Sequence, residues 1–262
     1  MNEKSQARKD RLIKGLIIIL FLGGIICLVI PFAKRALLSY RIESVSVQQT
    51  LSVPTNEVSQ GSVIIQPPTL SETLALYRHQ PEASLGRLVI PDVAIDVPIF
   101  PTLINENLLL GAVTMFPERD PNQENLVLVS HHLWNETLLF GPLMNVQPGQ
   151  AMFLSYGDQV YQYRVTEIKT VPATEISVMD NRQLGELTLI TCDRPTLTDQ
   201  RLVVNGTLVK EEPDEIKEKM HNAQEQGVKT ISDNRLIIRH FGWLLVCVFI
   251  IMLVLTWIVI KL

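Results

Sequence analysis

Two nearly unbroken apolar runs, one near each end of this 262-residue chain, constrain its fold more than any other feature. Residues 15–33 and 240–261 each have the length that a helix needs to cross the core of a bilayer. A run that is hydrophobic on every side requires either lipid or complete burial. The sequence therefore predicts two transmembrane helices, with room between them for one domain of ordinary size.

Basic residues flank the first apolar run unequally. Those before it are Lys4, Arg8, Lys9, Arg11 and Lys14, and those after it are Lys34, Arg35 and Arg41. Because basic flanks favour the cytoplasm, residues 1–14 are predicted to be cytoplasmic and residues 34–238 to lie outside the cell. A cleaved signal peptide and a buried core helix are the alternatives for this run. Its length and the lack of a small-x-small cleavage site favour an uncleaved anchor.

The chain between the two runs divides into three parts by composition. Residues 34–84 form a predicted extracellular stalk, because much of this part is rich in Ser, Thr, Gln and Pro. Within the stalk, Leu70, Leu74 and Tyr77 recur at helical spacing and predict one short amphipathic helix. Residues 85–210 form the predicted domain. Residues 211–239 are strongly charged and are interpreted as a solvated helical linker without chemistry.

The middle part reads as an all-β domain. Short strand-like runs separated by Pro, Gly and Asn recur along it, at residues 94–99, 125–130, 151–154, 159–168, 186–191 and 201–209. In one of them, Tyr161, Tyr163 and Val165 alternate with polar residues, the period-two pattern of a half-buried strand. Many short strands at such intervals predict a β-barrel or a β-sandwich.

Cys192 ends the Leu- and β-branched run at residues 186–192, and Asp193, Arg194 and Pro195 break the strand pattern after it. The other two cysteines, Cys27 and Cys247, lie inside the apolar runs, so Cys192 is the single thiol of the domain. A lone cysteine accompanied by histidines is a candidate nucleophile. The alternative is a small, buried and inert apolar residue.

Two further chemistry-bearing groups lie at strand ends. His131 and His132 follow the apolar strand at residues 125–130, and Arg201 opens the strand-like run after Cys192. Cysteine, histidine and arginine together indicate thiol-based group transfer without a cofactor. Without a second cysteine or a paired histidine spacing, the pattern gives no zinc site. The net charge of −4 does not suggest a nucleic-acid partner.

The stretch Thr188-Leu189-Ile190-Thr191-Cys192 resembles the TLxTC signature of sortases, the membrane-anchored cysteine transpeptidases of Gram-positive bacteria. Ser130-His131-His132 is similar to the histidine segment of their class A members, and Arg201 stands where the family keeps its arginine. The resemblance covers residues 85–209. It implies a closed β-barrel of about eight strands with short helices, which agrees with the strand pattern.

These residue types fit a two-step transfer. The thiolate of Cys192 is the nucleophile, and an imidazolium beside it stabilises the thiolate and protonates the departing amine. His131 is assigned this role, because the class A pattern places the catalytic histidine first; His132 is its rival. Arg201 is assigned to the oxyanion or the substrate carbonyl. Arg194 is its rival, but it lies in a loop, where a guanidinium is less well fixed.

What the domain acts on is implied by the resemblance alone. Sortases cut surface proteins at an LPxTG-type sorting signal between Thr and Gly, as cysteine endopeptidases of the hydrolase class, and pass the acyl group to an amine of the cell-wall precursor lipid II. In the family, the segment before the signature strand lines the substrate groove. The candidates here are Val171, Pro172, Ala173, Ile176 and Val178. Thr191 either hydrogen-bonds the substrate or is an ordinary strand residue.

The subclass is less constrained. Residues 111–115 and 139–143 resemble class A enzymes, whereas the second apolar run resembles class C, the pilin polymerases. The class C lid carries an Asp-Pro-aromatic motif, but Asp120-Pro121 is followed by Asn122, so class A is preferred. The acceptor, cell wall or pilin, stays open, and no carboxylate cluster predicts calcium. The remaining alternative is a non-catalytic, double-anchored β-domain that binds surface proteins.

Overall fold

The computed structural model describes residues 13–16, 19–20, 23–24, 27, 76, 80–134 and 137–225. Most of the predicted span 15–33, all of 240–261 and the predicted stalk helix around Leu74 lie outside these residues. Among the described residues, no helix has both the length and the apolar character needed to cross a membrane. The chain divides into two compact units, residues 1–36 with 231–262, and residues 37–230. In the first unit the described residues are helical.

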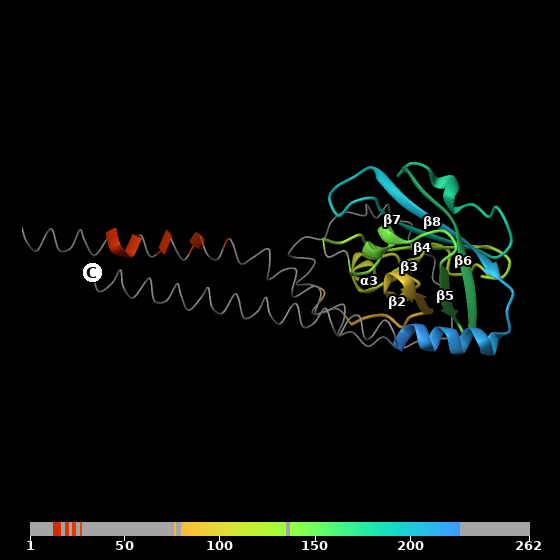
Figure 1. Cartoon of the computed structure of the whole chain (residues 1–262). Helices are drawn as coiled ribbons and strands as arrows, with labels where there is room; N and C mark the ends of the chain where they lie inside the picture. The colour runs from red at the N-terminus through yellow and green to blue at the C-terminus, as the bar shows by residue number, and fades with distance from the viewer. Residues whose placement is uncertain are drawn as a thin grey trace, which may run out of the picture. The chain divides into compact units, whose positions relative to one another are not determined.

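The second unit contains a closed barrel of eight strands, which confirms the fold that the sequence predicts (Figure 1). The neighbours around the barrel follow the order β1-β2-β3-β4-β7-β8-β6-β5. The strands are β1 (Gly86–Ile90), β2 (Ile95–Phe100), β3 (Ala112–Thr114), β4 (Asn125–Val129), β5 (Ala151–Tyr156), β6 (Gln159–Pro172), β7 (Glu186–Cys192) and β8 (Gln200–Val209).

The described helices of the second unit lie between the strands or after the last one. They are α3 (Asn105–Leu110), the 3-10 helices η1 (Pro91–Val93), η2 (Gly141–Asn145) and η3 (Ile176–Met179), and a helix at residues 213–225. Of these, η3 lies in the connection between β6 and β7, the segment that the resemblance assigns to the substrate groove. The closed barrel leaves no unpaired sheet edge, so the connections between strands carry the variable features of the surface.

β4 and β7 are buried along their whole length. They pair in parallel from Asn125↔Glu186 to Val129↔Ile190, and every residue of both strands is buried. Strands buried on both faces read as nearly continuous apolar runs, as β4 does, whereas β7 also carries the buried polar residues Glu186, Thr188 and Thr191. Each fully buried Leu, Ile or Val side chain contributes roughly 1.5–3 kcal/mol to folding. The strand that ends in Cys192 is therefore held rigidly by its buried pairing with β4.

Three details of the barrel differ from the sequence prediction. β1, at residues 86–90, was not among the predicted strand-like runs. β6 runs to Pro172 instead of ending near Ile168, and its last residues pair with the start of β8, at Val171↔Arg201 and Pro172↔Gln200. β3 was not predicted as a strand, because three residues are too few to show a period-two pattern. It is specified instead by its pairing with β2 and β4.

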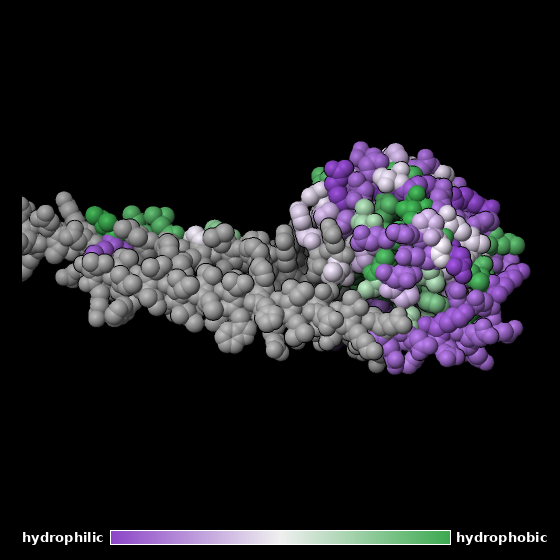
Figure 2. Space-filling view, viewed as in Figure 1, coloured by the Kyte–Doolittle hydropathy of each residue, from purple (hydrophilic) through white to green (hydrophobic). Residues whose placement is uncertain are grey.

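The helix at residues 213–225 packs on the outside of the barrel. Its buried residues Ile216, Met220 and Ala223 follow helical spacing and contact Val89 of β1 and Phe153 of β5. The outward side of this helix, at the lower edge of the domain in Figure 1, is hydrophilic in Figure 2. The predicted solvated linker is thus helical over these residues, but one side of the helix is buried.

Candidate active site

Cys192 is the last residue of β7 and pairs in register with Arg201 of β8. Residues directly opposite each other in an antiparallel pair point to the same face of the sheet, with Cβ atoms about 4.5–5.5 Å apart. Cys192 is 8% exposed and lies where the strand ends and a loop begins. The fold therefore brings together two of the three residues that the sequence assigns to chemistry.

Arg201 is held by two main-chain carbonyls. Its Nη1 atom donates to the carbonyl of Thr198 at 3.1 Å and to that of Gln200 at 2.9 Å. Arg194, its sequence rival, has a side chain that is 59% exposed and pairs with Asp193 at 3.2 Å. Because a fixed and sheltered guanidinium can orient a carbonyl better than an exposed one, the geometry favours Arg201 over Arg194.

Burial raises the pKa of the Cys192 thiol above its ordinary value. The positive charge of Arg201 opposes this shift in the pKa, whereas the negative charge of Asp193 adds to it. A raised pKa means that the neutral thiol predominates at neutral pH in the free protein. Formation of the nucleophilic thiolate therefore depends on a positive partner close to the sulfur.

The segment after β4 is fastened to β7 just below the thiol. The backbone N–H of Ser130 donates to the carbonyl of Ile190 at 3.2 Å, and the Ser130 hydroxyl donates to the carbonyl of Gly111 at 2.7 Å. The Thr191 hydroxyl in turn donates to the carbonyl of Ser130 at 2.9 Å. These bonds place the next residue, His131, beside the end of β7, where it is 4% exposed.

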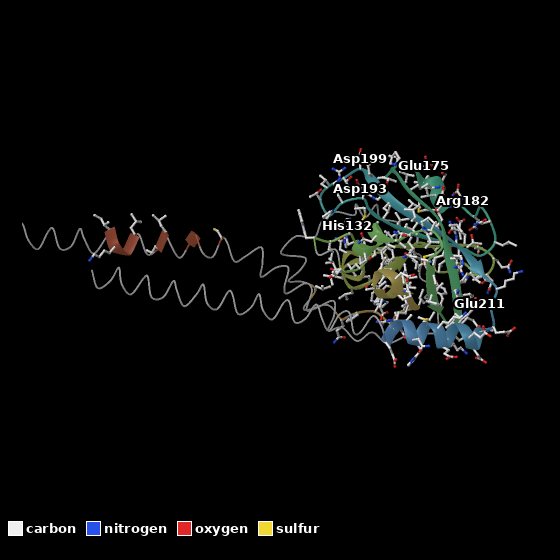
Figure 3. All side chains as sticks on the ribbon, viewed as in Figure 1. His132, Glu175, Arg182, Asp193, Asp199 and Glu211 are labelled. Atoms are coloured by element: carbon white, nitrogen blue, oxygen red, sulfur yellow. The ribbon has the colours of Figure 1, made fainter. Side chains whose placement is uncertain are left out.

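His132 contacts the nucleophile's own main chain. Its Nδ1 lies 3.0 Å from the carbonyl oxygen of Cys192, and the side chain is buried. Figure 3 shows His132 at the same end of the domain as Asp193, whereas Arg182, which precedes β7, lies on the other side in this view. Both histidines of the pair are therefore close to the end of β7, but the His132 ring is already engaged with the backbone.

A cleft of about 220 Å³ adjoins the start of β8. Its lining includes all five candidates from the segment before the signature strand, and it includes Arg201. Thr191 does not line it: this residue is buried, and its single hydroxyl proton is used by Ser130. The complete lining is Leu103, Met115, Val129, Val171, Pro172, Ala173, Glu175, Ile176, Val178, Met179, Ile190 and Arg201.

Six of these lining residues were missed by the sequence analysis. A signal existed for two of them: Ile190 lies two positions before Cys192, so both side chains face the same way, and Val129 is its partner across the parallel pair. Glu175 and Met179 lie in the same segment as the predicted residues. Leu103 and Met115 come from connections that only barrel closure brings to the cleft, so no local pattern assigns them to its lining.

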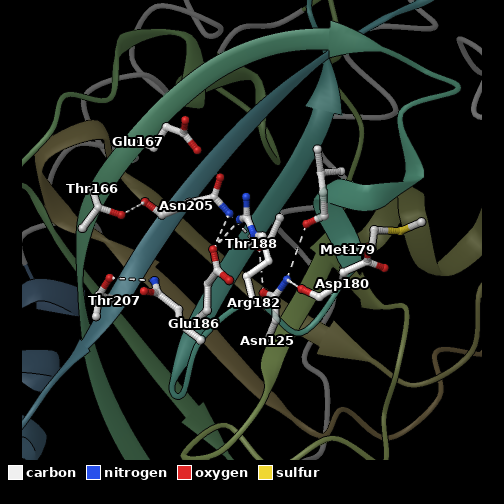
Figure 4. Close-up of polar contacts among 12 residues, drawn as sticks. Asn125, Thr166, Glu167, Met179, Asp180, Arg182, Glu186, Thr188, Asn205 and Thr207 are labelled. Atoms are coloured by element: carbon white, nitrogen blue, oxygen red, sulfur yellow. Dashed lines mark hydrogen bonds and ion pairs between the residues drawn. The ribbon is translucent and has the colours of Figure 1, made fainter.

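The wall of the cleft formed by residues 173–185 is tied to the barrel through its main chain. The Asn125 side-chain amide donates to the carbonyls of Val178 and Asp180 at 3.4 and 3.0 Å. Arg119 Nη1 donates to the carbonyls of Met179 and Asn125, each at 2.8 Å. The contacts made by Asn125 appear in Figure 4. We call this set of contacts the wall tether.

The wall tether continues into a buried polar chain between β4, β7 and β8. The Thr188 hydroxyl donates to Asn125 Oδ1 at 2.7 Å, and Asn205 donates to Thr188 Oγ1 at 2.8 Å and to Glu186 Oε1 at 3.0 Å. Glu186 also forms an ion pair with Arg182 (Figure 4). Buried polar groups linked in this way fix side-chain positions, because each lost partner leaves an unsatisfied group.

No group of three or more His, Cys, Asp or Glu side chains that could hold a metal ion occurs within the described part of the chain. Asp193 follows the thiol directly, but its side chain pairs with Arg194. Arg201 lines the cleft, whereas Cys192, His131 and His132 do not; Cys192 is joined to Arg201 by strand pairing and to His132 by its carbonyl. The thiol can form a covalent bond to an extended substrate whose apolar side chains enter the cleft.

Comparison with known proteins identifies relatives of this chain. A family model described as "Sortase domain" matches residues 88–209. Sortase A of Listeria monocytogenes is 31% identical over 205 residues, which cover 76% of this chain and 92% of the relative. Sortase A of Streptococcus agalactiae is 37% identical over 132 residues, covering 48% of this chain and 53% of the relative. A crystal structure of the Listeria protein matches 49% of this chain and 89% of that chain, with 40% identity and a TM-score of 0.48.

Proposed function

The chain belongs to the sortase family of cysteine transpeptidases, and from this premise we propose that it is a class A enzyme anchored in the membrane of a Gram-positive cell. In this proposal it cleaves surface proteins at an LPxTG-like signal, between Thr and Gly, and transfers the acyl group to an amine of lipid II. The observation that carries the proposal is the pairing of Cys192 with Arg201 next to the cleft.

The proposed first step forms a thioester. The Cys192 thiolate attacks the carbonyl carbon of the signal's Thr, and the negative charge that develops on the carbonyl oxygen is stabilised by Arg201. His131 gives its proton to the nitrogen of the departing Gly, which breaks the peptide bond and releases the amine. In the second step an incoming amine attacks the thioester, His131 removes its proton, and Cys192 leaves as the thiolate. Water in place of the amine gives the endopeptidase reaction.

The assignment of the proton transfer to His131 is supported by what His132 does. The His132 ring is buried, and its Nδ1 is used by the carbonyl of Cys192. A ring held by the main chain is poorly placed to move between proton donor and acceptor in two successive steps. His131 immediately precedes it, is buried at the same strand end and remains the proposed acid and base.

The apolar lining of the cleft supports a signal that begins with Leu and Pro. Val171, Ile176 and Val178 offer aliphatic surface, and burying one apolar side chain against such a surface stabilises the complex by about 1.5–3 kcal/mol. Arg201 belongs to the same lining, so a peptide seated in the cleft brings a carbonyl to the guanidinium. The proposal thus joins recognition of the signal and activation of its scissile bond within one cleft.

The decisive experiment uses the full chain in detergent micelles, with Cys27 and Cys247 replaced by Ala so that Cys192 is the single thiol. This parent protein is expected to cleave a fluorogenic LPxTG peptide and to form a mass adduct equal to the acyl fragment. Cys192→Ala should abolish both signals, and His131→Ala should lower the rate by at least about 100-fold. Equal cleavage by the parent and His131→Ala would contradict the assignment, and no cleavage by the parent would reject the enzyme.

The second apolar run, residues 240–261, favours one alternative, a class C polymerase whose acceptor is a pilin. The acceptor decides between the two classes. The full chain is incubated with the LPxTG peptide and either a short glycyl or alanyl amine or a pilin domain that presents a lysine. Class A predicts a product only with the short amine. Product formation on the pilin lysine alone assigns the chain to class C.

A further inference from the structure

The carbonyl of Cys192 receives its hydrogen bond from a side chain, where a continued strand would supply a backbone N–H. In the β4–β7 pair the Ile190 carbonyl accepts from the backbone N–H of Ser130 at 3.2 Å. Parallel ladders space these bonds evenly, so the next carbonyl that faces β4 is that of Cys192. β4 has ended at Val129, and the imidazole Nδ1 of His132 fills this place at 3.0 Å.

The chemistry of this contact fixes the tautomer of His132. A carbonyl oxygen only accepts hydrogen bonds, so Nδ1 must carry the proton. In the neutral ring Nε2 is then the acceptor, and it is buried without a hydrogen-bond partner among the described residues. The side chain is 7% exposed. Among the described residues, the His132 ring therefore makes one hydrogen bond, from Nδ1 to the Cys192 carbonyl.

The bond matters because few other hydrogen bonds hold the Cys192–Asp193 peptide, although the strand before it is firmly paired. The next backbone bond towards β8, from the Asp193 N–H to the Gln200 carbonyl, is long at 3.4 Å. Beyond it the chain enters the loop at residues 193–199. The orientation of the Cys192 carbonyl is coupled through ψ to the direction of the Cα–Cβ bond, so a pinned carbonyl restricts where the sulfur can lie. A misplacement of about 1 Å at a reacting atom can lower a rate by about 100-fold.

We propose that His132 is a positioning residue for the nucleophile: its Nδ1–H holds the Cys192 carbonyl and thereby aims the sulfur at the scissile bond. This inference rests on the proposed function of the same site, but it assigns a separate role to the second histidine. His132 transfers no proton in the reaction. Its Nδ1–H takes the place of the backbone N–H that a longer β4 would offer to the Cys192 carbonyl.

Isosteric replacement separates this role from general structural support. The amide nitrogen of an Asn side chain occupies nearly the position of a histidine Nδ1, whereas that of Gln occupies nearly the position of Nε2. His132→Asn therefore keeps the donor to Cys192 and discards Nε2, and His132→Gln does the reverse. His132→Phe keeps the aromatic volume and removes both nitrogens. If only the Nδ1 bond matters, Asn restores function and Gln and Phe do not.

The test uses the full chain that carries Cys27→Ala and Cys247→Ala, with kcat and KM measured on the LPxTG peptide. We expect His132→Asn to retain kcat within about threefold of the parent, and His132→Gln to lose about 30-fold, with KM unchanged in both. The proposal is upheld if kcat of the Asn variant exceeds that of the Gln variant by about tenfold or more. Any smaller difference overturns it, as does a loss carried by KM alone.

A second readout needs no substrate. The rate of alkylation of Cys192 by iodoacetamide is measured for the same variants, with thermal unfolding as the folding control. The Asn variant should alkylate at the parent's rate, and the Gln variant at a different rate, because its sulfur is no longer held in one orientation. Equal rates for the Asn and Gln variants count against the positioning role. A parent that alkylates normally but never cleaves the peptide refutes the enzyme proposal, while the ordering of the variants still tests His132.

Discussion

The two segments that flank β7 are held in different ways. Residues 173–185, before the strand, are tied by Asn125 and Arg119, which lie 53 to 60 residues away in the sequence. Residues 193–199, after the strand, rely mainly on neighbours: Arg194 pairs with Asp193, and Thr198 contacts Gln200 and Arg201. The exception is the bond from the Ala173 N–H to the Asp199 carbonyl at 2.6 Å, which joins the two segments where both meet the barrel.

This difference indicates that the segments before and after β7 have different roles in the proposed reaction. A segment tied to the barrel by long-range bonds opens only at a high free-energy cost, whereas one held by local bonds opens readily. The first segment forms a wall of the cleft, so in the proposed reaction that wall is the preorganised side for the donor peptide. The second borders the thiol on its other side. We infer that it yields when the leaving group departs and the acceptor enters.

The largest expected effect comes from Arg201, which lines the cleft and also bonds the carbonyl of Thr198 in the second segment. Arg201→Ala should lower kcat/KM for the LPxTG peptide by about 100-fold or more, because the developing oxyanion loses its charged donor. The matched control is Arg194→Ala, which removes an exposed guanidinium and should change kcat/KM by less than about threefold. If the two variants lose activity equally, the assignment of Arg201 is wrong.

The wall tether provides the next largest effect. Asn125→Ala leaves the carbonyls of Val178 and Asp180 without this donor, and it should lower the free energy of unfolding by about 2 kcal/mol. Because the wall is then less well ordered, KM for the peptide should rise about tenfold while kcat changes little. Urea unfolding and steady-state kinetics measure the two quantities. If KM is unchanged in a folded variant, the wall tether does not contribute to binding of the peptide.

A smaller effect is expected on the pKa of Cys192 when Asp193, in the second segment, is replaced. The negative charge of Asp193 helps to raise the pKa of Cys192, so Asp193→Asn should lower that pKa. The curve of alkylation rate against pH reports the thiolate fraction, and it should move to lower pH in this variant. Arg201→Gln should move the same curve to higher pH, because the positive charge of Arg201 lowers the pKa. Shifts in the same direction for both variants would contradict this electrostatic account.

The smallest effect is expected from a pair of exposed leucines, one in each segment. Leu184 is 70% exposed and Leu197 is 73% exposed, so Leu→Ser at either site should change the free energy of unfolding by less than about 0.5 kcal/mol. Both variants should keep KM for the donor peptide. Only Leu197→Ser is expected to change KM for the acceptor amine, by a few-fold at most. Equal acceptor effects at both sites would remove the distinction between the segments.

Much of the barrel was predictable because its strands carry their own signals. The apolar run of β4, the alternation in β6 and the strand ending on Cys192 are local patterns, and each lies where it was expected. β3 was missed because its three residues show no period. The burial of Gln162 breaks the alternation expected in β6, where Tyr161 and Tyr163 are buried as predicted. The sequence allows two roles for Thr191, and its hydroxyl donates to the Ser130 carbonyl.

The candidate site likewise has features that local sequence identifies and features that only tertiary contacts decide. The sequence by itself singled out the lone thiol of the domain, the histidine pair and the strand-opening arginine, since residue type and strand ends are properties of short segments. The tertiary structure decided that Cys192 faces Arg201, that the His132 ring meets the Cys192 carbonyl and that Asn125 holds the cleft wall. Those contacts join residues far apart in the chain. They depend on the register in which the closed barrel pairs β4 with β7 and β7 with β8, and no single segment encodes that register.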